Sequence, residues 1–203
     1  MSLKQSYTVL APIYDAIVSS ATAPMRRDSL RALTTEDDDQ ILLAGFGTGL
    51  DIPYLPQNAE YFAMDLTAAM LTRARQRLTP AHRIYLHRGN VMQMPYADDS
   101  FDSVVLHLIL AVVSEPHTVL TEAARVVRPG GRILILDKFL RPGQRAIARR
   151  LLNVMIRHIA TRTDVVFEEL LPHTPALQVI SDEPCLAGGW FRRIQLQKNS
   201  SGN

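Results

Sequence analysis

The chain has 203 residues, and 22 Lys and Arg against 20 Asp and Glu leave a formal net charge of +2. Hydrophobic residues make up 47% of the chain, which supports a buried core and excludes a largely disordered protein. The length suits one domain, and the small net charge gives no indication of nucleic-acid binding. Cys185 is the single cysteine, so an internal disulfide and a cysteine-rich zinc site are excluded. We expect no bound metal and, without an apolar run of roughly 18 residues, a cytoplasmic protein.

Apolar patterning along the chain predicts an alternation of strands and helices. Residues 8–33 carry apolar positions at helical spacing, interrupted near Pro24, and helices are expected over 67–78 and from Pro116 to about Val127. Pro129-Gly130-Gly131 predicts a turn after the last of these. Short apolar runs predict strands at 41–44, 61–64, 84–86, 103–108 and 133–136. This order is typical of an α/β, doubly wound parallel sheet. Segments 176–181 and 190–197 have no long helix between them, so they are expected to pair antiparallel.

A glycine-rich loop, Gly45-Phe46-Gly47-Thr48-Gly49, follows the first strand. Glycines here let the backbone approach a ligand at the carboxyl edge of the sheet, and the helix expected next directs its N–H groups at the same crevice. A tight turn without a ligand is the alternative. Leu50 stands where the dinucleotide fingerprint has its third glycine, which argues against a site for a dinucleotide pyrophosphate. The lysine of a P-loop is absent, which excludes that motif.

Asp65 ends the second predicted strand. A carboxylate in that place can accept both ribose hydroxyl protons of a nucleoside across the crevice. Alternatively, Asp65 caps the helix predicted over 67–78.

An ordered set of motifs between about residues 40 and 138 resembles the class I S-adenosylmethionine-dependent methyltransferases, in the methyltransferase type 11 group. The motifs are ILLAGFGTG (41–49), MDL with ML (64–66, 70–71), RGNV (88–91), MPYADDSFD (94–102) and ARVVRPGG (124–131). The resemblance implies a Rossmann-like sheet of seven strands, mostly parallel with an antiparallel C-terminal strand. It also implies S-adenosylmethionine as the cofactor. Within a single domain it implies a helical lid (1–35), a cofactor-binding core (36–140) and a substrate-side helix with a C-terminal hairpin (141–203).

The resemblance assigns roles residue by residue. The glycines of the loop would face the methionine part of the cofactor, Asp65 the ribose and Asn90 the adenine amino group. The implied cofactor-binding residues are Gly45, Phe46, Gly47, Thr48, Gly49, Asp65, Leu66, Met70, Asn90, Val91 and Leu106. The family usually has Asp or Glu where this chain has Leu43, and often Asp where it has Asn90. An Asn carbonyl can still accept a hydrogen bond from adenine, whereas Leu43 removes an acceptor.

Four residues are candidates for the methyl-transfer pocket: Tyr7, Tyr14, Asp15 and His107. Tyr7 and Tyr14 are seven residues apart, so they can share one helix face and contact the sulfonium by cation–π attraction, with Asp15 beside them. Packing of both rings against the core is the alternative. His107, at the end of the fourth strand, is either a general base or a hydrogen-bonded structural histidine.

The acceptor is indicated by two features. Residues 144–162 form a basic amphipathic segment, which can contact an anionic membrane surface peripherally or can simply cover the sheet. Residues 7–15 and, more loosely, 167–171 and 189–191 are similar to quinone-biosynthesis C-methyltransferases and bacterial phosphatidylethanolamine N-methyltransferases. The resemblance implies a small or lipid-like acceptor, such as a phospholipid amine or a quinone precursor. A non-catalytic cofactor-binding relative and a nicotinamide-dependent oxidoreductase remain alternatives.

Overall fold

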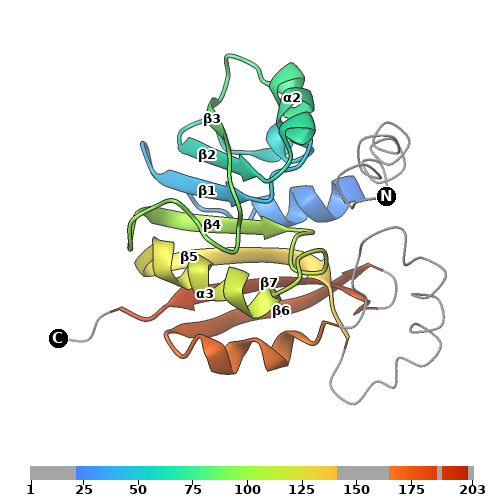
Figure 1. Cartoon of the computed structure of the whole chain (residues 1–203), viewed down its shortest axis with the longest axis vertical. Helices are drawn as coiled ribbons and strands as arrows, with labels where there is room; N and C mark the ends of the chain where they lie inside the picture. The colour runs from blue at the N-terminus through green and yellow to red at the C-terminus, as the bar shows by residue number, and fades with distance from the viewer. Residues whose placement is uncertain (1–21, 141–164, 187–188, 201–203) are drawn as a thin grey trace.

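The computed structural model describes residues 22–140, 165–186 and 189–200 (Figure 1). Residues 22–30 are helical. The strands are β1 (Gln40–Ala44), β2 (Glu60–Asp65), β3 (Arg83–Arg88), β4 (Phe101–His107), β5 (Val127–Lys138), β6 (Leu177–Leu186) and β7 (Phe191–Lys198). The other helices are η1 (Ile52–Tyr54), α2 (Ala68–Arg77), α3 (Pro116–Val126), η2 (Phe167–Glu169) and η3 (Leu171–His173).

The strands form one seven-stranded sheet in the order β3-β2-β1-β4-β5-β7-β6. Strands β1 to β5 pair in parallel, whereas β7 is antiparallel to both β5 and β6. In Figure 1, β1, β2 and β4 run in the same direction and end at one edge of the sheet. The predicted α/β, Rossmann-like sheet with an antiparallel C-terminal strand is therefore confirmed.

Both faces of the sheet are buried, as the continuous apolar run of β1 predicted. Ile41 and Leu43 belong to one core cluster, and Leu42 and Ala44 belong to the other. Side chains of a strand point alternately to opposite faces, so each face receives every second residue of β1. A charged residue inside this strand would be buried on either face.

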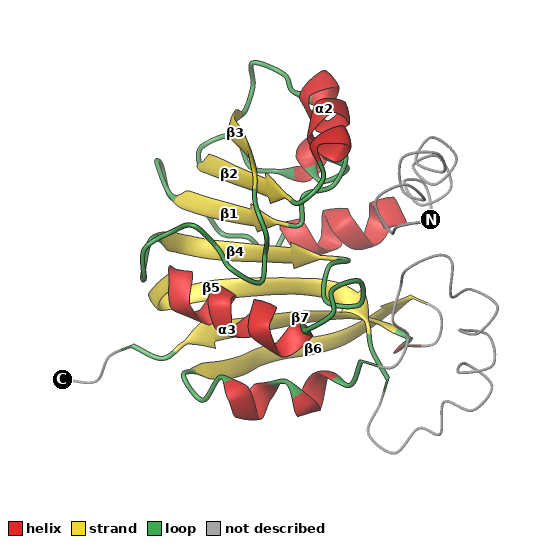
Figure 2. Cartoon of the chain, viewed as in Figure 1, coloured by secondary structure: helices red, strands yellow, loops and turns green. Residues whose placement is uncertain are grey.

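Helices cover the two faces as separate layers (Figure 2). Leu30, Ile52 and Ala74 place the N-terminal helix, η1 and α2 against the face that holds Ile41 and Leu43. The other face packs against α3 and η2, through a cluster that includes Val119, Leu120 and Phe167. The sheet is thus a middle layer, and its carboxyl edge is left for the loops that follow β1, β2 and β4.

The prediction of a helix directly after the glycine loop is wrong. Only the three-residue η1 forms there, before the chain enters β2. Pro53 lies inside η1, and Pro56 follows two residues after its end. A proline lacks the N–H that a helix needs and disfavours helical geometry in the residue before it, so the two prolines keep this turn from growing.

Two smaller expectations concern Pro24 and the turn after α3. Pro24 is the third of the helical residues 22–30, and residues 8–21 lie outside the described residues, so a break near Pro24 stays a prediction. The turn predicted at Pro129-Gly130-Gly131 is part of β5, which starts at Val127 and shifts register against β4 between Phe101 and Ser103. Gly130 has a φ of +78°, so the irregularity is absorbed as a bulge in a continuing strand.

Candidate functional site

The loop after β1 and the end of β2 lie directly beside each other at the carboxyl edge of the sheet. Ala44 pairs with Met64, and the Met64 carbonyl accepts hydrogen bonds from the N–H groups of Gly45 and Phe46, both at 2.9 Å. The glycine loop and Asp65 are therefore brought together, as parallel strands that end at one edge require.

The three loop glycines serve different purposes. All have positive φ (+76°, +59° and +79° for Gly45, Gly47 and Gly49), a region that side chains disfavour. A Cβ added to Gly45 would lie 2.6 Å from the Ile109 side chain, so protein atoms already fill that space. A Cβ on Gly49 would likewise meet Ile52, at 2.8 Å. A Cβ added to Gly47 would meet none of the described residues within 4 Å, so among these three glycines the described part of the chain leaves space only beside Gly47.

Asp65 is tied to the loop through both carboxylate oxygens. Its Oδ2 accepts a hydrogen bond from the Gly47 N–H at 2.9 Å, and its Oδ1 accepts one from the Thr67 N–H at 2.8 Å. Burial raises the pKa of Asp65, while these two donors work in the opposite direction. The Thr67 side chain also hydrogen-bonds to Asp65, so three donors act on the carboxylate and it keeps acceptor capacity for a ligand hydroxyl group. The residue that caps α2 is Thr67, so Asp65 is not its N-cap.

Further along the same edge, apolar and amide groups adjoin Asp65. Leu66 is 50% exposed, which is unusual for a large apolar side chain, and Met70 is partly buried on α2. The Asn90 Oδ1 accepts a hydrogen bond from the Met92 N–H at 3.0 Å, and Val91 is buried. An exposed Leu66 beside a carboxylate and an amide suits a ligand that is apolar on its faces and polar at its edges.

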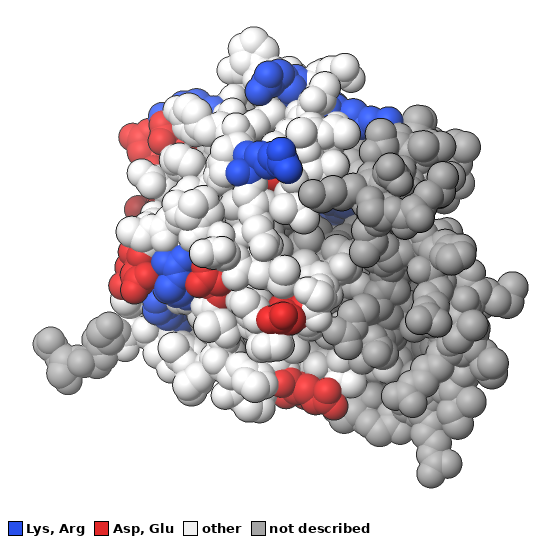
Figure 3. Space-filling model, in the orientation of Figure 1, with Lys and Arg blue, Asp and Glu red and all other residues white. Residues whose placement is uncertain are grey.

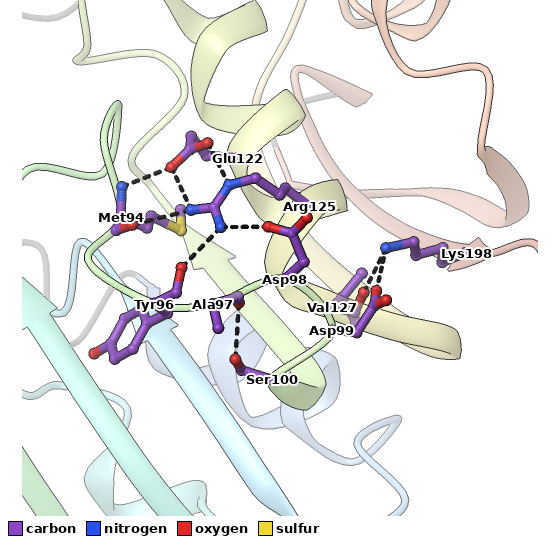
Figure 4. A network of polar contacts seen from close by, with 10 residues as sticks. All are labelled: Met94, Tyr96, Ala97, Asp98, Asp99, Ser100, Glu122, Arg125, Val127 and Lys198. Carbon is purple, nitrogen blue, oxygen red and sulfur yellow. Dashed lines mark hydrogen bonds and ion pairs between the residues drawn. The ribbon is translucent and has the colours of Figure 1, made fainter.

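Arg125 of α3 fixes the loop that continues from Asn90 and Val91 (Figure 4). Its guanidinium donates to the carbonyls of Met94 at 3.0 Å and Tyr96 at 2.7 Å. Glu122 binds Arg125 and also accepts the Met94 N–H at 2.7 Å. The guanidinium and carboxylate together hold the loop's backbone, so the position of Asn90 is supported from the adjacent helix.

Two side chains expected in the crevice lie in the core. Leu106 is 0% exposed and Phe46 is 6% exposed, and each belongs to a buried apolar cluster. Thr48 is also buried, while its carbonyl accepts a hydrogen bond from Arg77 Nη1 at 2.7 Å. Phe46 and Leu106 can therefore present only backbone atoms to a ligand, because alternate residues of a strand face the core.

His107 is fully engaged by neighbouring side chains. Its Nδ1 lies 3.0 Å from Asp51 Oδ1, and its Nε2 lies 3.0 Å from Ser29 Oγ. Arg26 Nη1 donates to the same Asp51 oxygen at 2.8 Å, and the His107 side chain is 2% exposed. A general base needs a free nitrogen within reach of the substrate. Both nitrogens of His107 are hydrogen-bonded, as in the structural alternative, and a role as a base stays a prediction that would require one of these bonds to break.

A second buried carboxylate, Asp137, lies near the end of β5. Its Oδ2 accepts the Ala111 N–H at 3.1 Å, and its Oδ1 accepts the Lys138 N–H at 2.8 Å. Burial raises the pKa of Asp137 to about 6, against the effect of these two donors. Asp137 thereby fixes the loop that follows β4, the loop whose Ile109 fills the space at Gly45.

Sequence reasoning missed Arg26, Ser29, Asp51 and Asp137. Asp137 had a usable signal, because it ends an apolar strand just as Asp65 does. The contact between Asp51 and Arg26 spans 25 residues, and that between Asp51 and His107 spans 56. No local pattern marks such pairs.

Some expectations fall outside the described residues. They concern Tyr7, Tyr14, Asp15 and the basic segment 144–162. Within residues 22–140, 165–186 and 189–200, no helix is long and apolar enough to cross a membrane. The same ranges contain no group of three or more His, Cys, Asp or Glu side chains that could hold a metal ion.

Known proteins with similar sequences are methyltransferases. A family described as a methyltransferase domain matches residues 42–135, which run from β1 into β5. A phosphatidylethanolamine N-methyltransferase of Cereibacter sphaeroides is 28% identical over 92% of this chain and 93% of its own. A demethylmenaquinone methyltransferase of Lactiplantibacillus plantarum is 30% identical over 64% of this chain, which spans only 60% of that enzyme's length.

Solved structures agree on the fold. The methyltransferase in a complex with the Haloferax volcanii Trm112 activator has a TM-score of 0.77 at 16% identity, covering 98% of this chain and 99% of its own. The [4+2]-cyclase SpnF has a TM-score of 0.76 at 15% identity, covering 98% and 96%. Because a cyclase shares this fold, the fold does not define the reaction, and the sequence relatives carry the assignment. The matched family makes residues 42–135 a methyltransferase domain, and the relatives and the seven-stranded sheet support an S-adenosylmethionine-dependent methyltransferase.

Proposed function

We propose that this methyltransferase transfers a methyl group from S-adenosylmethionine to the amine of a phospholipid head group. The observation that carries the proposal is the extent of the similarity to the phosphatidylethanolamine N-methyltransferase, 92% of this chain and 93% of that enzyme. The demethylmenaquinone methyltransferase of Lactiplantibacillus plantarum matches only 64% of this chain. A quinone precursor is the second acceptor to test.

The described residues suit this cofactor. A Cβ added to Gly47 would meet none of the described residues within 4 Å, and its neighbour Asp65 keeps acceptor capacity for a ribose hydroxyl group. Leu66 and Met70 offer apolar surface to adenine, and Asn90 and Val91 would meet its polar edge. The remaining loop residues, Gly45, Thr48 and Gly49, give the loop the shape that presents Gly47.

The chain's part in the reaction is binding and orientation. When bound, S-adenosylmethionine supplies a methyl group that its sulfonium centre already activates. Holding two reactants in line can contribute roughly 7–11 kcal/mol to lowering a barrier. An amine must be neutral to attack, and transfer from water into an apolar pocket favours its neutral form. His107 has both ring nitrogens hydrogen-bonded within the protein, and Asp137 is buried with a backbone N–H on each oxygen, so the proposal assigns neither of them the proton.

The N-terminal and basic segments complete the proposal. Residues 1–35 would form a lid over the cofactor, with Tyr7 and Tyr14 near the sulfonium. Residues 144–162 would contact an anionic membrane surface from the cytoplasm. On the face shown in Figure 3, acidic and basic side chains of the described residues lie interspersed, without a broad patch of one sign. The proposal therefore relies on the basic segment for attraction to the membrane.

Calorimetric titration with S-adenosylhomocysteine tests the cofactor site. We expect micromolar binding to the wild-type chain and a loss of at least about tenfold for Asp65→Asn, because the substitution removes the charge and one acceptor. Asp37→Asn, in the exposed acidic run, is the matched control and should bind as the wild type does. Binding that Asp65→Asn leaves unchanged would contradict the assignment of Asp65.

The acceptor is tested with S-adenosylmethionine carrying a labelled methyl group. Vesicles of phosphatidylethanolamine should become labelled in the lipid amine, whereas vesicles of phosphatidylcholine alone should not. Phosphatidylcholine vesicles doped with demethylmenaquinol form the third arm. Label in the quinol and none in phosphatidylethanolamine would replace the lipid amine by a quinone precursor as the acceptor.

A further inference from the structure

Four buried polar residues form a cluster beside the glycine loop. We call Arg26, Ser29, Asp51 and His107 the Asp51 cluster. Asp51 Oδ1 accepts hydrogen bonds from Arg26 at 2.8 Å and from His107 at 3.0 Å, and His107 contacts Ser29 at 3.0 Å. Arg26 is also held by Thr22, whose Oγ1 lies 3.1 Å from Arg26 Nε.

The cluster joins three separate elements of the chain. Arg26 and Ser29 belong to the helical residues 22–30, and His107 is the last residue of β4. Asp51 comes two residues after Gly49, and the N–H of the next residue, Ile52, donates to the Gly49 carbonyl at 3.2 Å. The turn that leaves the glycine loop is therefore attached through one carboxylate to both the N-terminal helix and the sheet.

Ionisation of Asp51 gives these contacts their strength. Burial opposes the charge, but His107 and Arg26 outweigh it and hold the pKa of Asp51 well below its usual range. The ionised carboxylate can only accept hydrogen bonds, so His107 carries a proton on Nδ1. When the ring is neutral, its Nε2 accepts the Ser29 hydroxyl proton. Every bond in the cluster then has a matched donor and acceptor.

The other hydrogen bonds that hold the glycine loop go to β2 and α2. The Gly45 and Phe46 N–H groups donate to the Met64 carbonyl, the Gly47 N–H donates to Asp65, and the Thr48 carbonyl accepts from Arg77. None of these bonds reaches the N-terminal helix. The Asp51 cluster connects the turn after the loop to residues 22–30, which lie within the segment proposed as the lid.

We propose that Asp51 is a positioning residue that couples the docking of helical residues 22–30 to the shape of the cofactor loop. Cofactor binding and docking of this helix then strengthen each other, because coupling between two sites is reciprocal. The inference rests on the proposed cofactor site. Asp51 supplies a carboxylate after the glycine loop. Before the loop there is none, because Leu43 stands where the family usually has an acid.

The first test compares the Asp51→Asn variant with the wild type. Affinity for S-adenosylhomocysteine should fall about tenfold, within the usual range for coupling between sites. Hydrogen–deuterium exchange of residues 22–31 should slow when S-adenosylhomocysteine binds to the wild type. In the variant this protection should be lost. Asp37→Asn, exposed and remote from the cluster, should preserve both results.

A second variant separates positioning from stability. Asp51→Asn leaves the Arg26 guanidinium buried without its carboxylate, which can unfold the chain. The double variant Arg26→Met with Asp51→Asn removes both charges, so its melting temperature should return toward that of the wild type. Its affinity for S-adenosylhomocysteine should stay low. Recovery of affinity together with stability would overturn the proposal and leave the cluster a structural role only.

Failure of the proposal is distinguishable from failure of the cofactor site. If the wild type does not bind S-adenosylhomocysteine, the proposed function is wrong. If the wild type binds it and the folded Asp51→Asn variant binds equally well, the coupling is wrong and the proposed function is unaffected.

Discussion

Asp51 and Asp137 are two fully buried carboxylates at the same edge of the sheet, and their surroundings give them opposite properties. Asp51 meets the Arg26 guanidinium and the His107 ring, and its pKa is lowered. Asp137 receives backbone N–H groups, with Lys138 as the charged group that acts on it, and its pKa is raised to about 6. Burial disfavours the charge in both. Backbone donors and the neighbouring Lys138 charge therefore do not offset the desolvation of Asp137, whereas a guanidinium and an imidazole offset that of Asp51.

The two carboxylates therefore affect stability in opposite directions with pH. Asp51 contributes stability above its unfolded pKa, near 3.8, and that contribution is lost as the pH falls through its lower folded value. Asp137 binds its proton more tightly in the folded state. Its contribution is present below its unfolded pKa, near 3.8, and is lost as the pH rises to about 6.

Removing the Arg26 cation should leave Asp51 in surroundings more like those of Asp137. This substitution should cause the largest loss of stability. We expect Arg26→Met to lower the free energy of unfolding by about 3–5 kcal/mol at pH 7, because it leaves a buried carboxylate with His107 alone. Urea unfolding measures this change. Arg27→Met is the matched control, since the Arg27 side chain is 51% exposed, and should change stability by less than about 1 kcal/mol. Equal effects from the two variants would contradict the role given to Arg26.

Neutralising Asp137 should remove a pH dependence. Between pH 4 and 6 the free energy of unfolding of the wild type should lose up to about 3 kcal/mol relative to Asp137→Asn, since one pKa unit corresponds to about 1.4 kcal/mol. Above pH 6 the difference should stay constant. Urea unfolding at several pH values measures it, with Asp37→Asn as the exposed control. A difference that does not change with pH would show that Asp137 titrates normally.

The comparison also marks what the sequence could predict. The strands were predictable because their apolar runs are buried on both faces, and Asp65 was predictable because it ends such a run. Asp137 follows another such apolar run and could have been recognised in the same way. The partners of Asp51 were not predictable, because contacts across 25 and 56 residues depend on how the helix and sheet pack.

The differences near the site between the expected and the observed structure have local physical causes. The expected helix after Gly49 fails because Pro53 and Pro56 confine it to η1. His107 was considered as a base because it ends a strand at the right edge. Its residue type gave no sign that Asp51 and Ser29 occupy both nitrogens. Leu106 was assigned to the crevice by the family motif, although its side chain points into the core.

The substitution in the Asp51 cluster with the smallest expected effect removes the Ser29 hydroxyl, which contacts His107 Nε2. Ser29→Ala should cost about 1 kcal/mol of unfolding free energy, because His107 Nε2 then lies buried without a partner while the contacts of Asp51 with Arg26 and His107 remain. Ser100→Ala is the control, since its hydroxyl donates to the Ala97 carbonyl at an exposed site. Thermal and urea unfolding together measure the pair. A loss as large as that of Arg26→Met would mean that Ser29 orients the His107 ring for Asp51, and the charged contacts would then depend on this hydroxyl.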